Sequence, residues 1–178
     1  SVDFISFESF GETEEIIVAA GCFWGVEHYL KKLDGVLLAE SGYCGGNEPN
    51  PDYKKVCNGN TGYFEVVRVI FDKEKVSLEA ILKYFFEIHD FTQTNGQGPD
   101  LGERYRSAVF YYDNKQKLIA ENLVKLLTEK SYKVATEIRE VKPYYVAEDY
   151  HLDYYMRNGS IPYCHSHTKI FSTVIKKN

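Results

Sequence analysis

The sequence predicts an α+β fold: a ferredoxin-like, split βαβ core with helices packed on a mixed sheet, long loops and an irregular C-terminal tail. Two observations lead to this fold class. The first six periodic segments run in the order strand, helix, strand, strand, helix, strand. The chain also has 178 residues and contains no internal repeat or low-complexity segment, which fits one domain with a sizeable core.

The first strand and the first helix follow directly on one another. The apolar run at 15–20 reads as a short buried strand, and apolar residues spaced by three and four predict a helix over 22–33. A strand over 36–42 follows, and then a loop over 43–62 that is rich in Gly, Asn and Pro. This loop is long for a connection inside a compact domain, and such loops tend to be functional.

The next segments repeat this alternation. A valine-rich strand is predicted over 63–72 and a helix over 77–89, which opens at Ser77. Serine is a favoured N-cap residue, although Ala80 stands where a capping box would have Glu or Gln. A second long, glycine-rich loop is expected over 91–104.

The last regular elements complete the predicted sheet. We expect a strand over 105–112, a long helix over 115–131 and a strand over 134–141. A short helix over about 147–157 precedes the irregular tail.

The composition limits the classes of function. Hydrophobic residues make up 44% of the chain and charged residues 26%, so it is globular, and its net charge of −5 without a basic stripe argues against a nucleic-acid partner. No apolar segment approaches the roughly 20 residues of a membrane span, and the first ten residues lack the pattern of a signal peptide. We therefore expect a cytoplasmic monomer that does not bind membranes. It is a single domain over residues 1–178, with 1–14 as an N-terminal extension and 158–178 as a C-terminal tail.

Four cysteines are spread along the chain: Cys22, Cys44, Cys57 and Cys164. They are too few and too dispersed for a disulfide scaffold, and no pair has CxxC spacing. This pattern predicts an intracellular protein that uses one or two thiols for chemistry. We interpret Cys57 as a structural thiol and leave the role of Cys44 open.

Cys22 stands where the first strand gives way to the first helix. A thiol near the start of a helix loses its proton easily, because the helix dipole favours negative charge there. Phe23 and Trp24, the only tryptophan, follow it immediately. A thiolate beside an aromatic wall indicates a nucleophile that faces an apolar substrate group.

An ordered set of motifs extends over residues 16 to 164. The motifs are Gly21-Cys22-Phe23-Trp24-Gly25-Val26-Glu27, Gly42-Tyr43-Cys44-Gly45-Gly46, Pro49-Asn50-Pro51-Asp52-Tyr53, Val56-Cys57, Thr61-Gly62-Tyr63-Phe64-Glu65-Val66-Val67, His89-Asp90-Phe91-Thr92-Gln93, Gln97-Gly98-Pro99-Asp100, Tyr105-Arg106-Ser107-Ala108, Ala147-Glu148-Asp149-Tyr150-His151 and Tyr163-Cys164. Together they resemble peptide methionine sulfoxide reductase, type A, which acts on the S epimer of the sulfoxide. The chain departs from the family pattern in places. Glu103-Arg104 replaces a Thr-Gln pair, and Cys44 stands where Ala or Thr is commoner.

The resemblance implies a set of catalytic residues. A sulfoxide sulfur becomes electrophilic only when its oxygen is protonated or strongly hydrogen-bonded, so the site needs a thiolate, an acid and hydroxyl donors. Cys22 would supply the thiolate. Glu65 interrupts an apolar strand, and burial would keep it protonated. By resemblance, Glu65, Tyr53 and Tyr105 hold and protonate the sulfoxide oxygen and bind the substrate, and Asp100 helps to organise the site. Phe23 and Trp24 would hold the substrate's methyl group.

The resemblance also implies how the enzyme is recycled. Cys22 attacks the sulfur, the oxygen leaves as water, and Cys22 is left as a sulfenic acid while methionine departs. A second thiol, expected to be Cys164 in the C-terminal tail, condenses with the sulfenic acid to a disulfide. Thioredoxin or dithiothreitol would reduce this disulfide by exchange, without a metal or organic cofactor. The substrates would be oxidised proteins, oxidised peptides and free methionine sulfoxide.

Three other functions remain open at this stage. A cysteine hydrolase could use Cys22 with a His and an Asp, and would turn over without a reductant. A redox-sensing thiol protein would associate with a partner on oxidation and would not consume methionine sulfoxide. A metal-binding module could use Cys44, Cys57, His89 and Cys164, although their irregular spacing argues against it.

Overall fold

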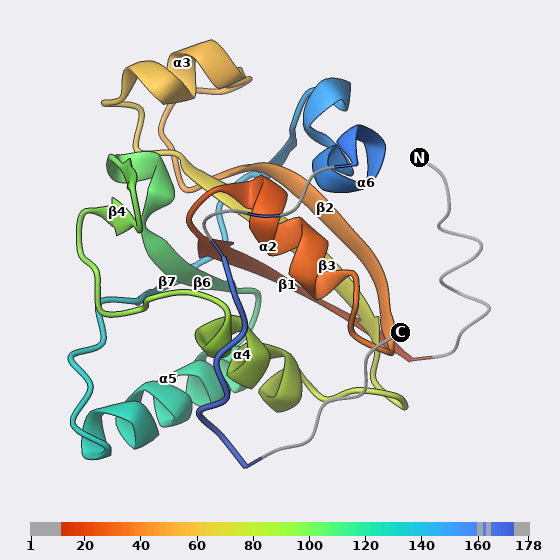
Figure 1. The fold of residues 1–178 in the computed structure, drawn as a ribbon, viewed down its shortest axis with the longest axis vertical. Coiled ribbons are helices and arrows are strands. Elements are labelled where there is room, and N and C mark those ends of the chain that lie inside the picture. Colours follow the sequence, from red (N-terminus) through yellow and green to blue (C-terminus); the bar gives the residue numbers. More distant parts are fainter. Residues whose placement is uncertain (1–11, 160–161, 163–164, 173–178) are drawn as a thin grey trace.

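The computed structural model describes residues 12–159, 162 and 165–172. Their elements are β1 (Thr13–Ala20), α2 (Phe23–Leu30), β2 (Val36–Cys44), α3 (Tyr53–Asn58), β3 (Phe64–Asp72), α4 (Leu78–Glu87), β4 (Gly96–Gln97), β5 (Asp100–Leu101), the 3-10 helix η1 (Glu103–Tyr105), β6 (Ser107–Tyr111), α5 (Asn114–Glu129), β7 (Glu137–Glu140), β8 (Tyr145–Val146), the 3-10 helix η2 (Asp149–His151) and α6 (Tyr154–Asn158). Figure 1 shows how they are arranged.

The main sheet has the order β7-β6-β1-β3-β2-β8. β1 and β2 both pair antiparallel with β3, which lies between them, so β1-α2-β2 is a split βαβ unit. β1 likewise lies between β3 and β6, which are joined through α4. β7 adds to β6 in the parallel direction and makes the sheet mixed. The predicted α+β, ferredoxin-like fold is therefore confirmed.

Side chains alternate between the two faces of the sheet along β1, as the strand period of two requires. Ile16, Val18 and Ala20 belong to the larger core cluster, which also holds the buried residues of α2, α4 and α5. Ile17 and Ala19 point to the opposite face and join a smaller cluster around Phe64 and Phe110. In Figure 1, α2 and α4 lie on the face of the sheet that is toward the viewer. Each functional side chain on a strand therefore lies on one of the two faces of the sheet.

Capping residues place the helices that support this core. Ser77 is the N-cap of α4 and accepts a hydrogen bond from the backbone N–H of Ala80 at 3.0 Å, as predicted. Asp113 does the same for α5 through the N–H of Gln116 at 2.9 Å. Among the described residues, no helix is long and apolar enough to cross a membrane.

The structure corrects several predicted segments. The loop over 43–62 contains the end of β2 and the short helix α3, which is too short to show a helical period in sequence. The second loop, over 91–104, contains β4, β5 and most of η1. Thr13 and Glu14, predicted to be part of an extension, belong to β1.

The predicted helix over 147–157 is wrong. This segment forms η2 and the five-residue α6, separated by Asp153 with a left-handed backbone (φ 54°). The physical reason is that Glu148 and His151 bond to other elements of the site, as described below, and these bonds hold the backbone away from a continuous helix.

Candidate functional site

Cys22 lies on a sharp turn between β1 and α2. It is the N-cap residue of α2 and is buried, with 5% of its surface exposed. The turn depends on Gly21, whose φ of +90° is unfavourable for other residues and whose missing side chain leaves room for Gln97. The prediction that Cys22 opens a helix is confirmed, and the helix dipole acts on its sulfur from the first turn.

Glu65 lies directly beside this helix start. Its carboxylate is 1% exposed and accepts a hydrogen bond from the backbone N–H of Phe23 at 3.2 Å. Phe64 and Val66, its neighbours in β3, point into the smaller cluster on the opposite face, so Glu65 points toward the helices. The pairing of Glu65 with Tyr43 of β2 fixes this register. The carboxylate thus caps α2 one residue away from the candidate nucleophile.

Arg104, the neighbour of Tyr105 in η1, contacts both Tyr105 and Glu65. Arg104 Nε lies 3.4 Å from Glu65 Oε2, and Arg104 Nη2 donates a hydrogen bond to Tyr105 Oη at 2.6 Å. The guanidinium carbon lies 4.4 Å from the ring centre of Tyr105 and 5.9 Å from that of Tyr53. The structure therefore brings together Glu65 and the two predicted tyrosines, and it adds an arginine between them.

Both tyrosines remain hydroxyl donors near neutral pH. Burial raises the pKa of Tyr105 to about 12, and the charges of Glu65 and Asp100 raise it too, while Arg104 opposes them. Burial also raises the pKa of Tyr53, and its neighbours Cys57, Glu65 and Tyr105 raise it further. The charge of Asp100 thus acts on Tyr105. Because both hydroxyls keep their protons, both can donate to a sulfoxide oxygen.

Phe23 and Trp24 form an aromatic wall with His151. Phe23 is 1% exposed, and its ring centre lies 5.1 Å from that of His151. Trp24 Nε1 donates a hydrogen bond to His151 Nδ1 at 3.0 Å, and the indole stacks on Tyr154 with ring centres 3.7 Å apart. The ring of Tyr53 lies 4.4 Å from that of His151 on another side. The wall is therefore continuous with the hydroxyl donors.

Glu148 holds the first loop against the sheet, and the sequence did not assign it a role. Its carboxylate accepts hydrogen bonds from Tyr43 Oη and from the backbone N–H of Tyr53, both at 2.8 Å. Burial alone would raise the pKa of Glu148, but these hydrogen bonds lower it below the ordinary value of a glutamate. The carboxylate thus fixes the start of α3 and with it the position of Tyr53. The sequence feature that could have identified Glu148 was the family motif that contains both Glu148 and His151.

Glu103 fixes the other end of the first loop. Its Oε2 accepts hydrogen bonds from the backbone N–H groups of Thr61 and Gly62, both at 3.0 Å. Glu103 and Arg104, the two charged residues that precede Tyr105, therefore contact different parts of the structure. Glu103 binds the loop before β3, and Arg104 points to Glu65.

The described cysteines occupy different environments. Cys44 is fully buried in the smaller cluster on the far face of the sheet, and its Sγ donates to the carbonyl of Lys142 at 3.3 Å. Burial raises the pKa of the Cys44 thiol. Cys57 is only partly buried and interacts with Tyr53, and its interpretation as a structural thiol stays a prediction. Cys164 lies outside the described residues.

The described part of the tail that follows Cys164 lies against the helix of the nucleophile. His165 is 5% exposed, and its Nε2 donates to the carbonyl oxygen of Ala20 at 2.6 Å. A Cβ added at Gly25 would overlap the imidazole, so the ring packs on the bare face of α2 at this glycine. Tyr29 Oη donates to the backbone carbonyl of His165 at 3.2 Å.

Glu87, at the C-terminal end of α4, anchors the tail further along. This carboxylate is 3% exposed and accepts hydrogen bonds from the N–H groups of Ile170 and Phe171, both at 2.9 Å. His167 Nε2 lies 2.8 Å from its other oxygen. The described residues after Cys164 thus run from the start of α2, at His165, to the end of α4, at Glu87.

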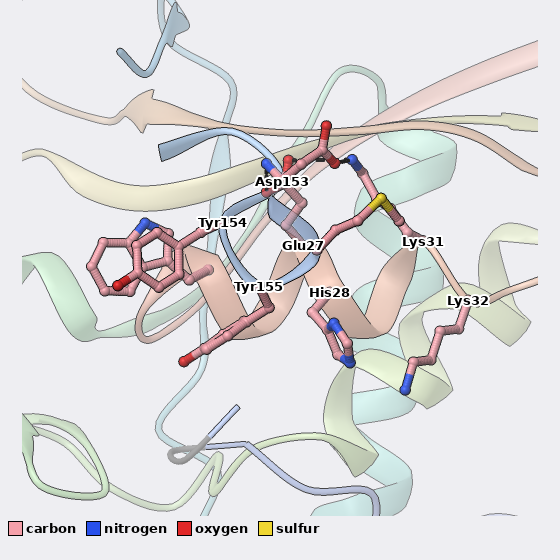
Figure 2. Close-up of a pocket in the computed structure, with 9 residues that line it drawn as sticks. Glu27, His28, Lys31, Lys32, Asp153, Tyr154 and Tyr155 are labelled. Carbon is pink, nitrogen blue, oxygen red and sulfur yellow. Dashed lines mark hydrogen bonds and ion pairs between the residues drawn. The ribbon is translucent and has the colours of Figure 1, made fainter. Parts of the chain in front are cut away.

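A separate pocket of about 190 Å³ lies between α2 and α6. Figure 2 shows Glu27, Lys31 and Asp153 meeting on one side of it. Asp153 N donates to Glu27 Oε1 at 2.9 Å, Lys31 lies 3.7 Å from Glu27 Oε2, and Lys31 also pairs with the carboxylate of Asp153. Met156, the only methionine of the chain, lines the pocket and is 78% exposed.

Glu27 makes the stability of the protein depend on pH. Burial raises its pKa to about 7, although Lys31 and Ser41 oppose the shift. Between pH 4.5 and 7 the folded state therefore holds this proton more tightly than the unfolded state, so the free energy of unfolding falls as pH rises. Over this pH range, the titration of Glu27 lowers the free energy of unfolding by about 3 kcal/mol. We expect Glu27→Gln to remove this slope, as measured by urea unfolding at pH 5, 6, 7 and 8.

Glu79→Gln is the matched control for that experiment. Glu79 is exposed on α4 and pairs with Lys83, so its substitution changes the same charge without a buried proton. Its unfolding curves should follow the wild type at every pH. Parallel slopes in the wild type and in Glu27→Gln would refute the assignment of the effect to Glu27.

Among residues 12–159, 162 and 165–172, no group of three His, Cys, Asp or Glu side chains is arranged to hold a metal ion. Cys44 belongs to the far face of the sheet. His89 donates from Nδ1 to the carbonyl oxygen of Phe85 at 2.7 Å, and its Nε2 lies 2.8 Å from Ser107 Oγ. Cys44 and His89 therefore do not converge as the metal-binding alternative requires.

Comparisons with known proteins find relatives over most of the chain. The family model of peptide methionine sulfoxide reductase matches residues 14–178. Peptide methionine sulfoxide reductase MsrA of Trichodesmium erythraeum is 45% identical over 154 residues, which cover 85% of this chain and 87% of that protein. The MsrA of Vesicomyosocius okutanii is 44% identical over 146 residues, covering 82% and 88%.

Solved structures show the same fold. Reduced Mxr1 from Saccharomyces cerevisiae superposes with a TM-score of 0.82 at 35% identity, covering 89% of this chain and 93% of that one. Mxr1 has also been solved in complex with Trx2. Methionine sulfoxide reductase A of Corynebacterium diphtheriae gives a TM-score of 0.76 at 34% identity, covering 87% and 80%.

Proposed function

The chain belongs to the peptide methionine sulfoxide reductase family, and we propose that it reduces its substrate with Cys22, Glu65, Tyr53 and Tyr105. The enzyme is a peptide-methionine (S)-S-oxide reductase, so the hydrolase and sensor alternatives are set aside. The observation that carries the residue assignment is the hydrogen bond from Phe23 N to Glu65. It places a buried carboxyl group at the helix start that Cys22 caps.

Cys22 is the nucleophile of the proposed reaction. Its thiolate bonds to the sulfoxide sulfur, the S–O bond breaks, and the oxygen takes up two protons and leaves as water. A water molecule then attacks the Cys22 sulfur of the resulting sulfonium, which releases methionine and one proton and leaves Cys22 as a sulfenic acid. The N-terminus of α2 favours the thiolate that starts this sequence.

Glu65, Tyr53 and Tyr105 act on the departing oxygen. The carboxyl group of Glu65 supplies a proton, and the two tyrosines donate hydrogen bonds where negative charge develops. Asp100 acts on Tyr105 through its charge, and Glu148 holds the backbone of Tyr53 through the hydrogen bond described above. Phe23 and Trp24 receive the methyl group on the aromatic wall.

A second thiol returns the enzyme to its reduced form. Cys164 attacks the sulfenic sulfur of Cys22, water leaves and a disulfide forms. Thioredoxin then reduces the disulfide by thiol exchange, and dithiothreitol replaces it in vitro. Two contacts of the residues after Cys164 support its role: His165 packs on α2 at Gly25, and Ile170 bonds to Glu87. The complex of Mxr1 with Trx2 supports thioredoxin as the reductant.

We extend the proposal to the state in which the enzyme works. It acts as a monomer in the cytoplasm, without a metal or organic cofactor, on oxidised proteins, oxidised peptides and free methionine sulfoxide. The small number and wide spacing of the cysteines support the compartment, because a disulfide scaffold is typical of oxidising compartments. Its single domain carries the resolving cysteine in the tail over 158–178.

A racemic substrate tests the proposed function directly. A peptide that contains both epimers of methionine sulfoxide is incubated with the enzyme and dithiothreitol, and the epimers are separated by chromatography. We expect the S epimer to disappear and the R epimer to remain. Without a reductant, the enzyme should release no more than the methionine allowed by its own thiols. Equal consumption of both epimers, or continued turnover without a reductant, would contradict the proposal.

A further inference from the structure

Arg104 lies among the groups that act on the sulfoxide oxygen. We propose that Arg104 is a positioning residue of the sulfoxide-reducing step. Its guanidinium holds the Glu65 carboxyl group and the Tyr105 hydroxyl in place around the oxygen, and its charge strengthens Glu65 as an acid. This inference rests on the proposed function, because it acts through the roles assigned there to Glu65 and Tyr105.

The geometry of the guanidinium supports the positioning role. One edge, at Nε, faces Glu65 Oε2 at 3.4 Å, and another, at Nη2, donates to Tyr105 Oη at 2.6 Å. The Arg104 side chain is 19% exposed, and it also lies over the rings of Tyr53 and Tyr105. A planar fork held on two partners and two rings restricts the positions of all of them.

The charges around Glu65 support the second part of the proposal. The titratable or charged groups around Glu65 include Tyr43 of β2, Tyr53 of α3, and Arg104 and Tyr105 of η1, with Glu148 behind Tyr43. Cys22 precedes Phe23, whose backbone N–H donates to Glu65 at the start of α2. Arg104 forms an ion pair with Glu65. Burial would lower the pKa of Arg104, but the hydrogen bond to Tyr105 and the charges of Cys57 and Glu65 raise it, so the group stays positive.

A positive neighbour has two consequences for Glu65 as a proton donor. It stabilises the carboxylate that remains after the proton has moved to the oxygen, so the protonated form donates more readily. It also makes Glu65 lose its proton at a lower pH, so the decline of the rate with rising pH begins at a lower pH. Arg104 thus makes the step faster where Glu65 is protonated, and it lowers the upper limit of the pH range in which Glu65 is protonated.

A single turnover without a reductant tests both consequences. Reduced enzyme is mixed with sulfoxide peptide, and methionine formation is followed by rapid quench from pH 5.5 to 9.5. For Arg104→Gln we expect a plateau rate about threefold lower and an alkaline limb about one pH unit higher. For Arg104→Lys we expect a limb close to the wild type and a lower plateau, because lysine keeps the charge and loses the planar fork.

Two further comparisons separate this role from a structural one. Arg139→Gln removes a positive charge from β7, where Arg139 lies over Phe64 and Phe110, and its profile should match the wild type. In a Glu65→Gln background, Arg104→Gln should produce no further shift of the alkaline limb. The amplitude of the single turnover gives the fraction of folded enzyme, and Arg104→Lys decides the positioning role if Arg104→Gln does not fold.

The outcomes that overturn the inference are distinct from those that overturn the function. Matching pH profiles of the wild type and Arg104→Gln, or an equal shift in the Glu65→Gln background, refute the role of Arg104 and leave the reductase assignment in place. An unchanged plateau in Arg104→Lys refutes the positioning part. A wild-type enzyme that forms no methionine refutes the proposed function, and this inference with it.

Discussion

Replacing Cys22 with serine is expected to abolish the reduction of methionine sulfoxide. A serine hydroxyl at the N-cap of α2 keeps its proton near neutral pH and is a far weaker nucleophile than a thiolate. We expect the rate to fall by roughly a thousandfold or more, with dithiothreitol and with thioredoxin alike. The measurement is the methionine released in a single turnover, which also excludes any effect of recycling.

The matched control is Cys44→Ala. Cys44 is fully buried on the far face of the sheet, so its removal should leave the single turnover intact. Thermal unfolding of Cys22→Ser should resemble that of the wild type, since serine is also a favoured N-cap residue. A full burst of methionine from Cys22→Ser would show that another thiol is the nucleophile.

Replacing Cys164 with serine is expected to separate the two reductants. Dithiothreitol can reduce the sulfenic acid of Cys22 directly, so turnover with dithiothreitol should stay within about twofold of the wild type. Thioredoxin requires the disulfide, and turnover with thioredoxin should fall by roughly a hundredfold. Mass spectrometry after one turnover should find a Cys22–Cys164 disulfide in the wild type and a free sulfenic acid in the variant.

The structure changes the conclusion that would follow from a failed test. Normal cycling of Cys164→Ser with thioredoxin would show that another cysteine resolves the sulfenic acid. From the sequence, Cys44 would be the next candidate. The structure excludes this, because the sheet separates Cys44 from the helix face on which Glu65 lies. Cys57, beside Tyr53 and near Arg104, becomes the next candidate instead.

Most of the fold could be predicted from the strand and helix periods of the sequence. Alternation along β1 and β3, and the N-cap at Ser77, are local signals, and the structure confirms the elements that they predict. The segment over 147–157 was mispredicted because its conformation is set by distant partners. Glu148 bonds to β2 and α3, and His151 bonds to Trp24, and none of these contacts leaves a periodic pattern in the sequence.

The candidate site was predicted unevenly for the same reason. Glu65 bonds to the residue that follows Cys22, and the turn before α2 and the strand pattern of β3 are both visible in the sequence. The position of Arg104 depends on how the loop before β6 folds back over β3, which no local pattern encodes. Its only signal was a charged residue where the family has a neutral one.

The core of this reductase contains no thioether. The single thioether of the chain, Met156, lies exposed at the edge of α6, while the largest fully buried side chains are Tyr, Phe, Ile and Leu. An oxidant that converts a buried thioether into a polar sulfoxide would force an oxygen atom into a close-packed interior. The described interior offers no such target, so the repair enzyme can encounter the damage that it reverses in other proteins without being unfolded by it.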